Sequence, residues 1–256
     1  MQLPVSLTSG PVRWGDGSYS VEIVASLRRL QSKPWDWVVL LSGQDYPIRP
    51  LNRLTAALSS TGFVAFCPAT EESVSERRDE IDRRYRYRHY FVPGTWPVAA
   101  LAMGKKVGTV LEHRTGGAVR VQARPRRAGP AIAVRRQDTI FDARRPCFMG
   151  SDYFVASRPA VDAALALLHA DPRILAYYRR CFVPSESLFA SAFRWTATGP
   201  VADDNFHFMR FSGLANPRTI TPADLPELST MDKVFARKFT DDSGWVEQEL
   251  PLLATR

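Results

Sequence analysis

The sequence predicts an α/β fold built around a mostly parallel central sheet, and two observations support this prediction. Apolar runs typical of buried strands alternate along the chain with segments whose apolar residues recur every three or four positions. Alternation of this kind is typical of α/β sheets with helices on their faces. With 256 residues, 45% of them hydrophobic, the chain is long enough for one sizeable core. No repeat or linker divides it, so a single domain over residues 1–256 is expected.

The elements of the first part follow one another at short spacing. Residues 18–31 carry apolar side chains at three-residue spacing, which predicts a helix packed on the sheet. Residues 35–42 are a continuous apolar run, typical of a parallel strand covered on both faces. Next are expected a polar turn over 42–47, a helix over 51–59 and a strand over 61–67.

The second part is less regular at first. Residues 71–88 are dense in charges of both signs and are expected to be helical, whereas the basic segment 105–137, rich in Gly and Pro, is expected to be a long surface loop. Residues 147–157 predict one strand ending in a helix N-cap. Helices are then expected over 159–169, 172–181 and 185–195.

The chain is basic, with a net charge of +8. Only five of its 34 cationic residues are lysines, so 29 (34 − 5) are arginines. This composition favours anionic partners such as nucleotides, phosphates or acidic membrane surfaces. An alternative explanation of the arginine bias is genomic base composition. Charge alone does not distinguish among the three kinds of anionic partner.

The sequence contains few features that indicate a cellular location. No run of about 18 apolar residues is present, and the first residues lack the charged start and apolar stretch of a signal peptide. The three cysteines stand in no metal-ligand pattern and are expected to be buried, reduced thiols. A cytoplasmic location is expected, with peripheral contact at an anionic membrane surface as a further option.

Glu186 is the first candidate catalytic residue. It opens an amphipathic helix in which Ser185 is expected to be the N-cap, so the carboxylate lies near the positive end of the helix dipole and stays ionised. An ionised carboxylate can accept a proton from an attacking hydroxyl. The alternative is a helix-favouring glutamate in a first turn, without a chemical role.

Arg237 and Lys238 are the candidate cation pair. Phe235 and Phe239 flank them, which predicts a strand or short turn tied into the core with the charged heads at a site. Fixed cations stabilise a departing diphosphate as its negative charge grows. The alternative is a pair of surface cations bound to nearby aspartates, namely Asp232, Asp241 or Asp242.

The turn at 42–47 directly follows the strongest predicted strand, where ligands of open α/β sheets bind. Gly43 permits close backbone approach, and Asp45 is expected to point into the crevice. The alternative is that Asp45 caps the turn and Pro47 ends it.

No metal or cofactor motif stands out. The chain has no Gly-rich phosphate loop, no Gly-x-Ser-x-Gly motif and no His/Cys cluster with zinc spacing. Asp203 and Asp204 come nearest to a metal-binding pair, but turn chemistry after Gly199 and Pro200 explains them. Neither a metal nor a cofactor is therefore expected.

Taken in order, five segments resemble the core-2/I-branching glycosyltransferase family, which includes the branching N-acetylglucosaminyltransferases and peptide O-xylosyltransferases. The chain looks like a bacterial-type member of this family (glycosyltransferase family 14-like). The segments are Arg13-Trp14-Gly15, residues 35–49 with Ser42-Gly43-Gln44-Asp45-Tyr46-Pro47, Gly150-Ser151-Asp152-Tyr153-Phe154, Pro184-Ser185-Glu186-Ser187-Leu188-Phe189 and Phe235-Ala236-Arg237-Lys238-Phe239. They span residues 13–240 at family-like spacing. Ser185-Glu186 and Arg237-Lys238 look closer to the xylosyltransferase branch than to the mucin-type branch.

The resemblance implies a GT-A-like fold, a nucleotide-sugar donor, inversion at the anomeric carbon and no divalent metal. The implied donor is a UDP-sugar, and the sugar most expected is N-acetylglucosamine or xylose. The implied acceptor is a hydroxyl of a glycan, peptide or other molecule. The implied site residues are Glu186 as catalytic base, Arg237 and Lys238 on the diphosphate, Asp152 and Tyr153 near donor sugar and acceptor, and Trp14, Gly15 and Asp45 in the donor-side crevice.

The chain departs from the family pattern in two places. Family members usually begin with a further strand and helix that help to hold the nucleotide base, and this N-terminal unit is expected to be missing here. The family also often has arginine where His207 stands, and Arg210, three places on, would lie on the other face of a strand.

Two other functions remain open at this point. Residues 83–91 interleave cations with aromatic residues, as single-strand RNA-binding surfaces do, although no RNA-binding fold signature is present and a nucleic-acid partner is the minor expectation. The other is a catalytically degenerate family member that binds a glycan or nucleotide without turnover.

Overall fold

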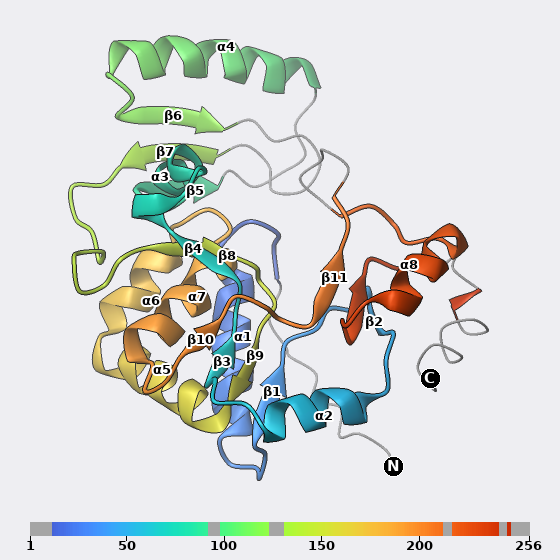
Figure 1. The fold of residues 1–256 in the computed structure, drawn as a ribbon. Helices are drawn as coiled ribbons and strands as arrows, with labels where there is room; N and C mark the ends of the chain where they lie inside the picture. Colours follow the sequence, from blue (N-terminus) through green and yellow to red (C-terminus); the bar gives the residue numbers. More distant parts are fainter. Residues whose placement is uncertain (1–11, 92–97, 123–130, 212–216, 241–244, 247–256) are drawn as a thin grey trace. The chain divides into compact units, whose positions relative to one another are not determined.

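The structure is a computed structural model that describes residues 12–91, 98–122, 131–211, 217–240 and 245–246. The fold is mixed α/β, with eight α-helices among the described residues and separate sheets of two to four strands (Figure 1). None of the described helices is long and apolar enough to cross a membrane.

The chain forms two compact units, and each collects three separate stretches of sequence. The first unit comprises residues 1–35, 69–152 and 158–197, and the second comprises residues 36–68, 153–157 and 198–256. Each unit is described by itself below, and the single-domain expectation stays a prediction.

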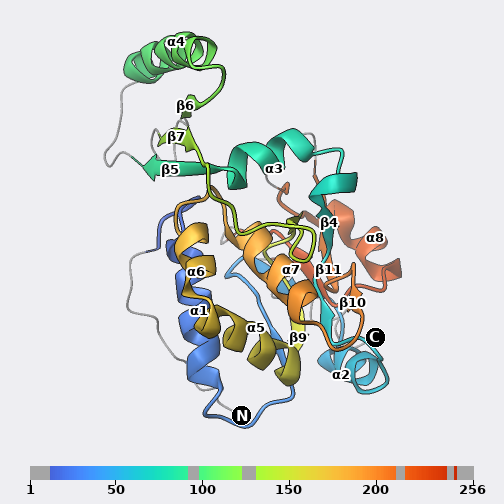
Figure 2. The same ribbon diagram turned by 90° about the vertical axis from the view of Figure 1, so that its left-hand side faces the viewer.

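The first unit contains most of the helices. They are α1 (Ser18–Leu30), α3 (Arg78–Tyr85), α4 (Val98–Arg114), α5 (Arg158–Ala170), α6 (Pro172–Tyr178) and α7 (Ser185–Thr196), with a 3-10 turn η1 (Glu72–Val74). Its strands are β4 (Ala69–Glu71), β5 (Tyr87–Phe91), β6 (Val119–Gln122), β7 (Ala131–Arg135) and β8 (Phe148–Gly150). Helix α5 packs on α7, and α1 contacts both (Figure 2). Burial of Tyr178, Phe182, Phe189 and Phe193 supplies the driving force for this packing.

An antiparallel sheet in the order β5-β7-β6 belongs to the same unit. Side chains alternate along β5, so that Tyr87 and His89 are buried while Arg88 and Tyr90 are exposed. Helix α4 packs closely on β6, with Gly108 against Val121. The prediction of a loop over 105–137 was therefore wrong, because much of this segment is helix and paired strand.

The second unit holds short strands and two helices. Its elements are α2 (Leu51–Ser59), α8 (Leu225–Thr230), a 3-10 turn η2 (Pro222–Asp224), β1 (Trp37–Val39), β2 (Asp45–Pro47), β3 (Ala65–Phe66), β9 (Val155–Ser157), β10 (Val201–Ala202), β11 (His207–Met209) and β12 (Phe235–Arg237). One sheet has the order β1-β9-β3-β10 and the other β11-β12-β2. Only β10 with β3 and β11 with β12 pair in parallel among the described strands. The prediction of a mostly parallel sheet is not met by these strands.

Five helices predicted from the sequence are confirmed, at 18–30, 51–59, 158–170, 172–178 and 185–196. The strand predicted over 35–42 is shorter, since only Trp37–Val39 pairs, and these residues are half-buried instead of covered on both faces. The strand predicted over 147–157 is two strands, β8 and β9, which belong to different units. Apolar runs show which residues avoid water, but the pairing partner decides where a strand begins and ends.

Candidate functional site

Glu186 is the second residue of α7, and the rest of that helix anchors it firmly. The face of α7 that carries Leu188, Phe189, Ala192 and Phe193 is buried. The N-cap position is held by Pro184, without a side-chain capping hydrogen bond, so the prediction that Ser185 is the N-cap was wrong. Ser185 is itself buried as the first helical residue. Glu186 thus lies in the first turn, as predicted, close to the positive end of the helix dipole.

Arg84 of α3 is the main partner of Glu186. Its guanidinium donates to the carboxylate of Glu186 and also to that of Glu80. The side chain of Arg84 is 12% exposed and that of Glu186 is 25% exposed, so water screens this pair only weakly. Burial works against the charge on Arg84, but the nearby carboxylates outweigh it and raise the pKa of Arg84.

The pKa of Glu186 lies above the ordinary value for a glutamate. Burial is the main cause, because it disfavours the charged form. Arg84 works in the opposite direction, and the carboxylate of Asp152 raises the pKa further. Glu186 is therefore a carboxylate whose proton affinity is increased by its surroundings while a cation keeps the ionised form accessible.

The segment before Glu186 is held in an unfavourable backbone conformation. Val183 has φ of 46°, in the left-handed region that β-branched residues avoid. Its N–H donates to the carbonyl of Gly15 (2.8 Å), and its carbonyl accepts from the hydroxyl of Tyr85 (3.2 Å) and the N–H of Glu186 (3.4 Å). Strain maintained by surrounding contacts is common at functional sites. The bond from Val183 also brings Gly15, from near the start of the described chain, to the start of α7.

Trp14 lies in the same region as part of an aromatic cluster around Phe182. The ring centre of Phe182 is 5.8 Å from that of Trp14, 5.9 Å from His89 and 6.4 Å from Phe91. Phe182 is buried, whereas Trp14 is 43% exposed. An exposed indole next to a rigid aromatic support offers a flat apolar surface to a ligand.

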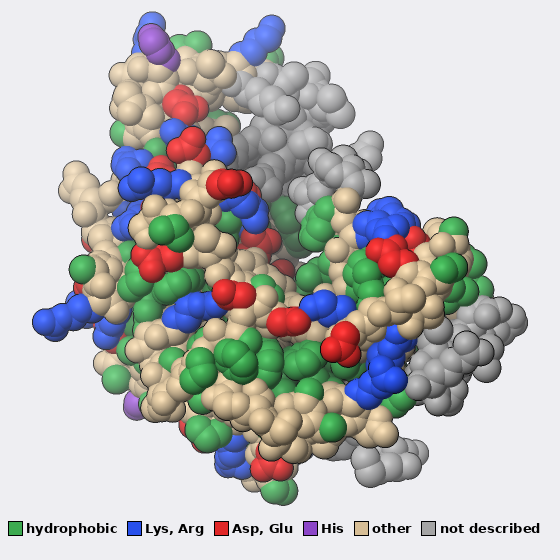
Figure 3. Space-filling view, viewed as in Figure 1, with side chains coloured by type: hydrophobic (Ala, Val, Ile, Leu, Met, Phe, Trp, Pro, Cys, Tyr) green, Lys and Arg blue, Asp and Glu red, His purple; other side chains and the backbone are tan. Residues whose placement is uncertain are grey.

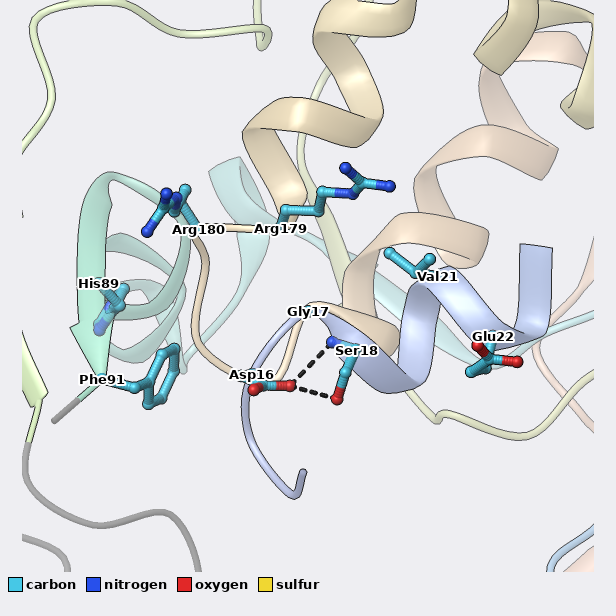
Figure 4. A pocket seen from close by; sticks show the side chains of 9 residues that line it. All are labelled: Asp16, Gly17, Ser18, Val21, Glu22, His89, Phe91, Arg179 and Arg180. Atoms are coloured by element: carbon cyan, nitrogen blue, oxygen red, sulfur yellow. Dashed lines mark hydrogen bonds between the residues drawn. The ribbon is translucent and has the colours of Figure 1, made fainter. Parts of the chain in front are cut away.

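A pocket of about 470 Å³ opens beside this cluster (Figure 4). It is lined by the start of α1 (Asp16, Gly17, Ser18, Val21, Glu22), by β5 (His89, Phe91) and by the turn after α6 (Arg179, Arg180). Figure 4 shows Phe91 and His89 on one side of the pocket and the start of α1 on the other. Trp14, Gly15, Asp152 and Glu186 are not among its lining residues.

The start of α1 is shaped by two short-range features. The carboxylate of Asp16 accepts from the backbone N–H of Ser18 (2.8 Å) and from its hydroxyl. Gly17 lies directly against the backbone of Arg179, where a Cβ would be only 2.5 Å from the Cα of that residue. Glycine therefore allows α1 and the turn after α6 to meet and form the pocket wall.

In the second unit, Arg237 is tied to Asp45. Its guanidinium lies 3.3 Å from the carboxylate of Asp45, donates to the hydroxyl of Ser42, and stacks 4.7 Å from the ring centre of Tyr153. The side chain of Asp45 is 0% exposed, so it does not point into an open crevice as expected. Arg237 pairs with Asp45 instead of Asp232, and Asp241 and Asp242 lie outside the described residues.

Lys238 differs from its neighbour. It is half-buried, and its ammonium group has no carboxylate partner within the described ranges. Its backbone carbonyl accepts from Ile220 (2.9 Å), which fixes the chain there. The pair predicted from the sequence thus divides into Arg237, which is in an internal ion pair, and Lys238, which has no described carboxylate partner.

His207 and Arg210, the two residues at the second departure from the family pattern, have different surroundings. His207 lies between the rings of Tyr153 (5.3 Å) and Phe235 (5.2 Å), and burial lowers its pKa. Arg210 pairs with Asp224 at 3.2 Å and also with Glu227, so it is committed elsewhere. It does not take the place of an arginine at position 207.

Asp204 follows the turn interpretation. One oxygen of Asp204 accepts from the N–H of Phe206 (2.7 Å), and the other pairs with Lys233 (2.7 Å). In the part of the chain that the structure describes, no three His, Cys, Asp or Glu side chains gather as a metal site would require.

The predicted site residues therefore fall into two groups. Trp14, Gly15, Asp152 and Glu186 belong to the first unit, and Asp45, Tyr153, Arg237 and Lys238 belong to the second. Sequence reasoning missed Arg84, Glu80 and the pocket-lining Gly17 and Arg179. The Arg-Tyr run around Arg84 was a signal, but its role depends on a partner 102 positions away.

The chain matches no protein-family model, and no curated protein is significantly similar to it.

Proposed function

We propose that the protein is a metal-independent, inverting glycosyltransferase that moves a sugar from a UDP-sugar to an acceptor hydroxyl. We further propose that its two units together correspond to a GT-A-like fold. The observation that carries the proposal is Glu186, a largely buried carboxylate of raised pKa at the start of α7, connected through Val183 to the Trp14–Gly15 segment.

Glu186 acts as the general base in this mechanism. Its carboxylate takes the proton of the acceptor hydroxyl while that oxygen forms a bond to the anomeric carbon. The bond from this carbon to the diphosphate oxygen breaks in the same step, and UDP leaves with the electron pair. One displacement of this kind inverts the anomeric configuration.

Arg84 positions the base. Its guanidinium donates to the carboxylates of both Glu186 and Glu80. The positive charge of Arg84 is therefore shared between two carboxylates while it holds Glu186 in place. A raised pKa makes Glu186 a stronger base than an ordinary glutamate, while the charge of Arg84 favours its ionised form.

Lys238 and Arg237 are the proposed cations for the departing diphosphate. Arg237 is prepositioned by Asp45 and Tyr153, and the half-buried Lys238 adds a charge that no described carboxylate neutralises. Fixed cations of this kind stabilise the negative charge that develops on the leaving group. Asp152 and Tyr153 are assigned to the donor sugar and acceptor, and Trp14 and Gly15 to the donor side, where the buried Asp45 acts through the Arg237 that it holds.

The RNA-binding alternative loses support from the burial pattern of residues 83–91. Tyr85 and Tyr87 are buried, and Arg84 and Arg86 pair with Glu186 and Glu72. The run therefore does not form a continuous stacking surface. Among the described residues of the face in Figure 3, cationic side chains are scattered among acidic ones.

The direct test measures UDP binding by calorimetry with EDTA present, followed by UDP release from UDP-N-acetylglucosamine and UDP-xylose in the presence of acceptors. Glu186→Gln should lower turnover by roughly 10²-fold or more while UDP affinity stays the same. Glu76→Gln, a matched change at an exposed position, should leave both unchanged. Binding without turnover in the wild type would indicate a degenerate, binding-only protein, and no UDP binding would overturn the proposal.

The cation pair is tested separately. Lys238→Ala should weaken UDP binding without loss of stability, whereas Lys106→Ala, at an exposed position of α4, should not. Arg237→Ala should weaken binding and also destabilise the protein, because it leaves the buried Asp45 without its cation. Unchanged UDP affinity in Lys238→Ala would remove its assigned role.

A further inference from the structure

A second cavity of the first unit, of about 520 Å³, is rich in arginine. It is bordered by β5, by the chain that follows β7 and by α6, and Figure 2 shows α6 below β5. Five guanidinium groups line it: Arg88, Arg136, Arg145, Arg173 and Arg180. So dense a group of like charges favours an anionic partner.

Two of these arginines are compensated by the same aspartate. Asp171 lies 3.1 Å from Arg145 and 2.8 Å from Arg173. The hydrogen bond from Arg173 is the largest influence that lowers the pKa of Asp171 to about 2, so this carboxylate stays ionised. One negative charge thus serves two positive ones.

The other three arginines have no carboxylate partner within the described ranges. Arg136 is held by a hydrogen bond to the carbonyl of Tyr177 (2.8 Å) and stacks 3.7 Å from the centre of that ring. Arg88 and Arg180 are exposed, and the N–H of His89 donates to the carbonyl of Arg180 (2.7 Å), which keeps their backbones adjacent. A rigid cation and two exposed ones therefore lie around one cavity.

The charges of the lining residues do not cancel. Asp138, Asp142 and Asp171 are the acidic residues of the lining. Five arginines and three aspartates leave a formal excess of +2 (5 − 3). A phosphate monoester carries about −1.5 to −2 charges at pH 7, which matches this excess.

We propose that this cavity binds a phosphate monoester. Arginine presents paired N–H donors in a fork that matches phosphate oxygens, and the cavity volume falls within the range of about 300–1,000 Å³ that small ligands occupy. The phosphate belongs either to a free small metabolite or to a lipid headgroup, since both present the same group.

This site is separate from the proposed transfer chemistry. Glu186, Asp152, Trp14 and Gly15 do not line the cavity, and of its described lining residues Arg180 alone also lines the pocket of Figure 4. Arg88 lines this cavity but not the pocket of Figure 4, whereas Arg179 lines that pocket but not this cavity. Both side chains are exposed. The chain thus offers a matched pair of substitutions.

The test is titration of the full chain with glycerol 2-phosphate, with glycerol as its uncharged counterpart. Arg88→Gln should weaken binding of glycerol 2-phosphate about tenfold, because a charge-assisted hydrogen bond is lost. Arg179→Gln changes the net charge equally and should leave the affinity unchanged. Glycerol should not bind.

Three results would overturn the proposal: no binding of glycerol 2-phosphate or of phosphatidic acid vesicles, equal weakening in both variants, or no weakening in Arg88→Gln. Vesicles of phosphatidylcholine with and without phosphatidic acid distinguish the two sources of phosphate. Binding to phosphatidic acid vesicles that is stronger than to glycerol 2-phosphate, and is lost in Arg88→Gln, assigns a lipid headgroup. Binding of the soluble ester alone assigns a metabolite. Neither result depends on UDP binding, so the two proposals fail independently.

Discussion

The guanidinium of Arg84 pairs with the carboxylate of Glu186 across 102 positions of sequence. This contact joins α3 to the first turn of α7 and places a cation against a carboxylate of the proposed site whose pKa is raised. The balance between burial and this cation decides at which pH Glu186 is ionised.

The first prediction concerns the pH dependence of Glu186. As a base it must be ionised, so transfer should fall on the acid side through a pKa above the value of about 4.3 of an exposed glutamate. A pH profile of kcat/KM for wild type measures this limb. An acid limb at or below the ordinary glutamate pKa would contradict the assignment.

The same shift predicts a stability effect with a definite sign. Because the folded-state pKa is raised, the folded protein binds the proton more tightly than the unfolded chain. The free energy of unfolding of wild type, relative to Glu186→Gln, should therefore decrease as pH rises from about 4.3 through the raised pKa. Urea unfolding of both proteins at several pH values checks it, and a difference that grows with pH would show the opposite shift.

Two glycines of the first unit should respond in opposite directions to alanine. A Cβ at Gly17 would lie 2.5 Å from the Cα and 2.9 Å from the carbonyl oxygen of Arg179, so Gly17→Ala should destabilise by about 1–3 kcal/mol. Gly104 is inside α4 with nothing within 4 Å of its Cβ position, and Gly104→Ala should stabilise by up to about 1 kcal/mol. Thermal unfolding of the two variants measures both.

Arg49 should prove essential to the second unit. It is only 5% exposed, and its guanidinium donates to the carbonyls of Ile48, Leu228 and Ser229 at 2.7 Å and to that of Met231 at 3.0 Å. The bonds to Leu228, Ser229 and Met231 satisfy carbonyls at or just after the end of α8. A lysine ammonium cannot reach all of them, so Arg49→Lys should cost about 2–4 kcal/mol of unfolding free energy.

The matched control for Arg49 is Arg29→Lys, at an exposed position of α1. That substitution should change stability by less than about 0.5 kcal/mol. Equal effects of the two changes in urea unfolding would mean that the buried hydrogen bonds of Arg49 contribute little.

The thiols should be unreactive in the folded protein. Cys67, Cys147 and Cys181 are buried, and burial raises the pKa of Cys147 and of Cys181 to about 12. Raised pKa values keep Cys147 and Cys181 in the thiol form near neutral pH, and the thiolate is the reactive form. A disulfide reagent should therefore label them only after addition of denaturant, and rapid labelling of the native protein would contradict their burial.

The sequence predicted the helices better than the sheets, for physical reasons. Helix α7 has apolar residues at helical spacing, which is a local property, and its bounds followed from it. Strand direction and length depend on partners distant in the chain, so β1 was predicted too long and in the wrong kind of sheet. In the segment 105–137, the short alternations of β6 and β7 were obscured by glycines and arginines.

The site was predictable to a similar extent. The position of Glu186 in a first turn followed from local pattern, whereas its pairing with Arg84 did not. Asp45 was expected at an open crevice because it follows a strand, but the buried pairing with Arg237 depends on β2 lying beside β12. Local sequence indicates which residue types are available, and tertiary contacts decide which of them face a ligand.

The interleaved order of the two units has a consequence for any attempt to dissect the protein. Each unit is assembled from three stretches, with stretches of the other unit between them along the chain. No single cut separates the polypeptide into two fragments that each contain a whole unit. A protease that nicks one exposed connection would leave both units tethered by the remaining ones, and a truncation from either end removes part of only one unit at first. Contacts between distant stretches also predict slow folding, because much of the chain must be ordered before either core can close.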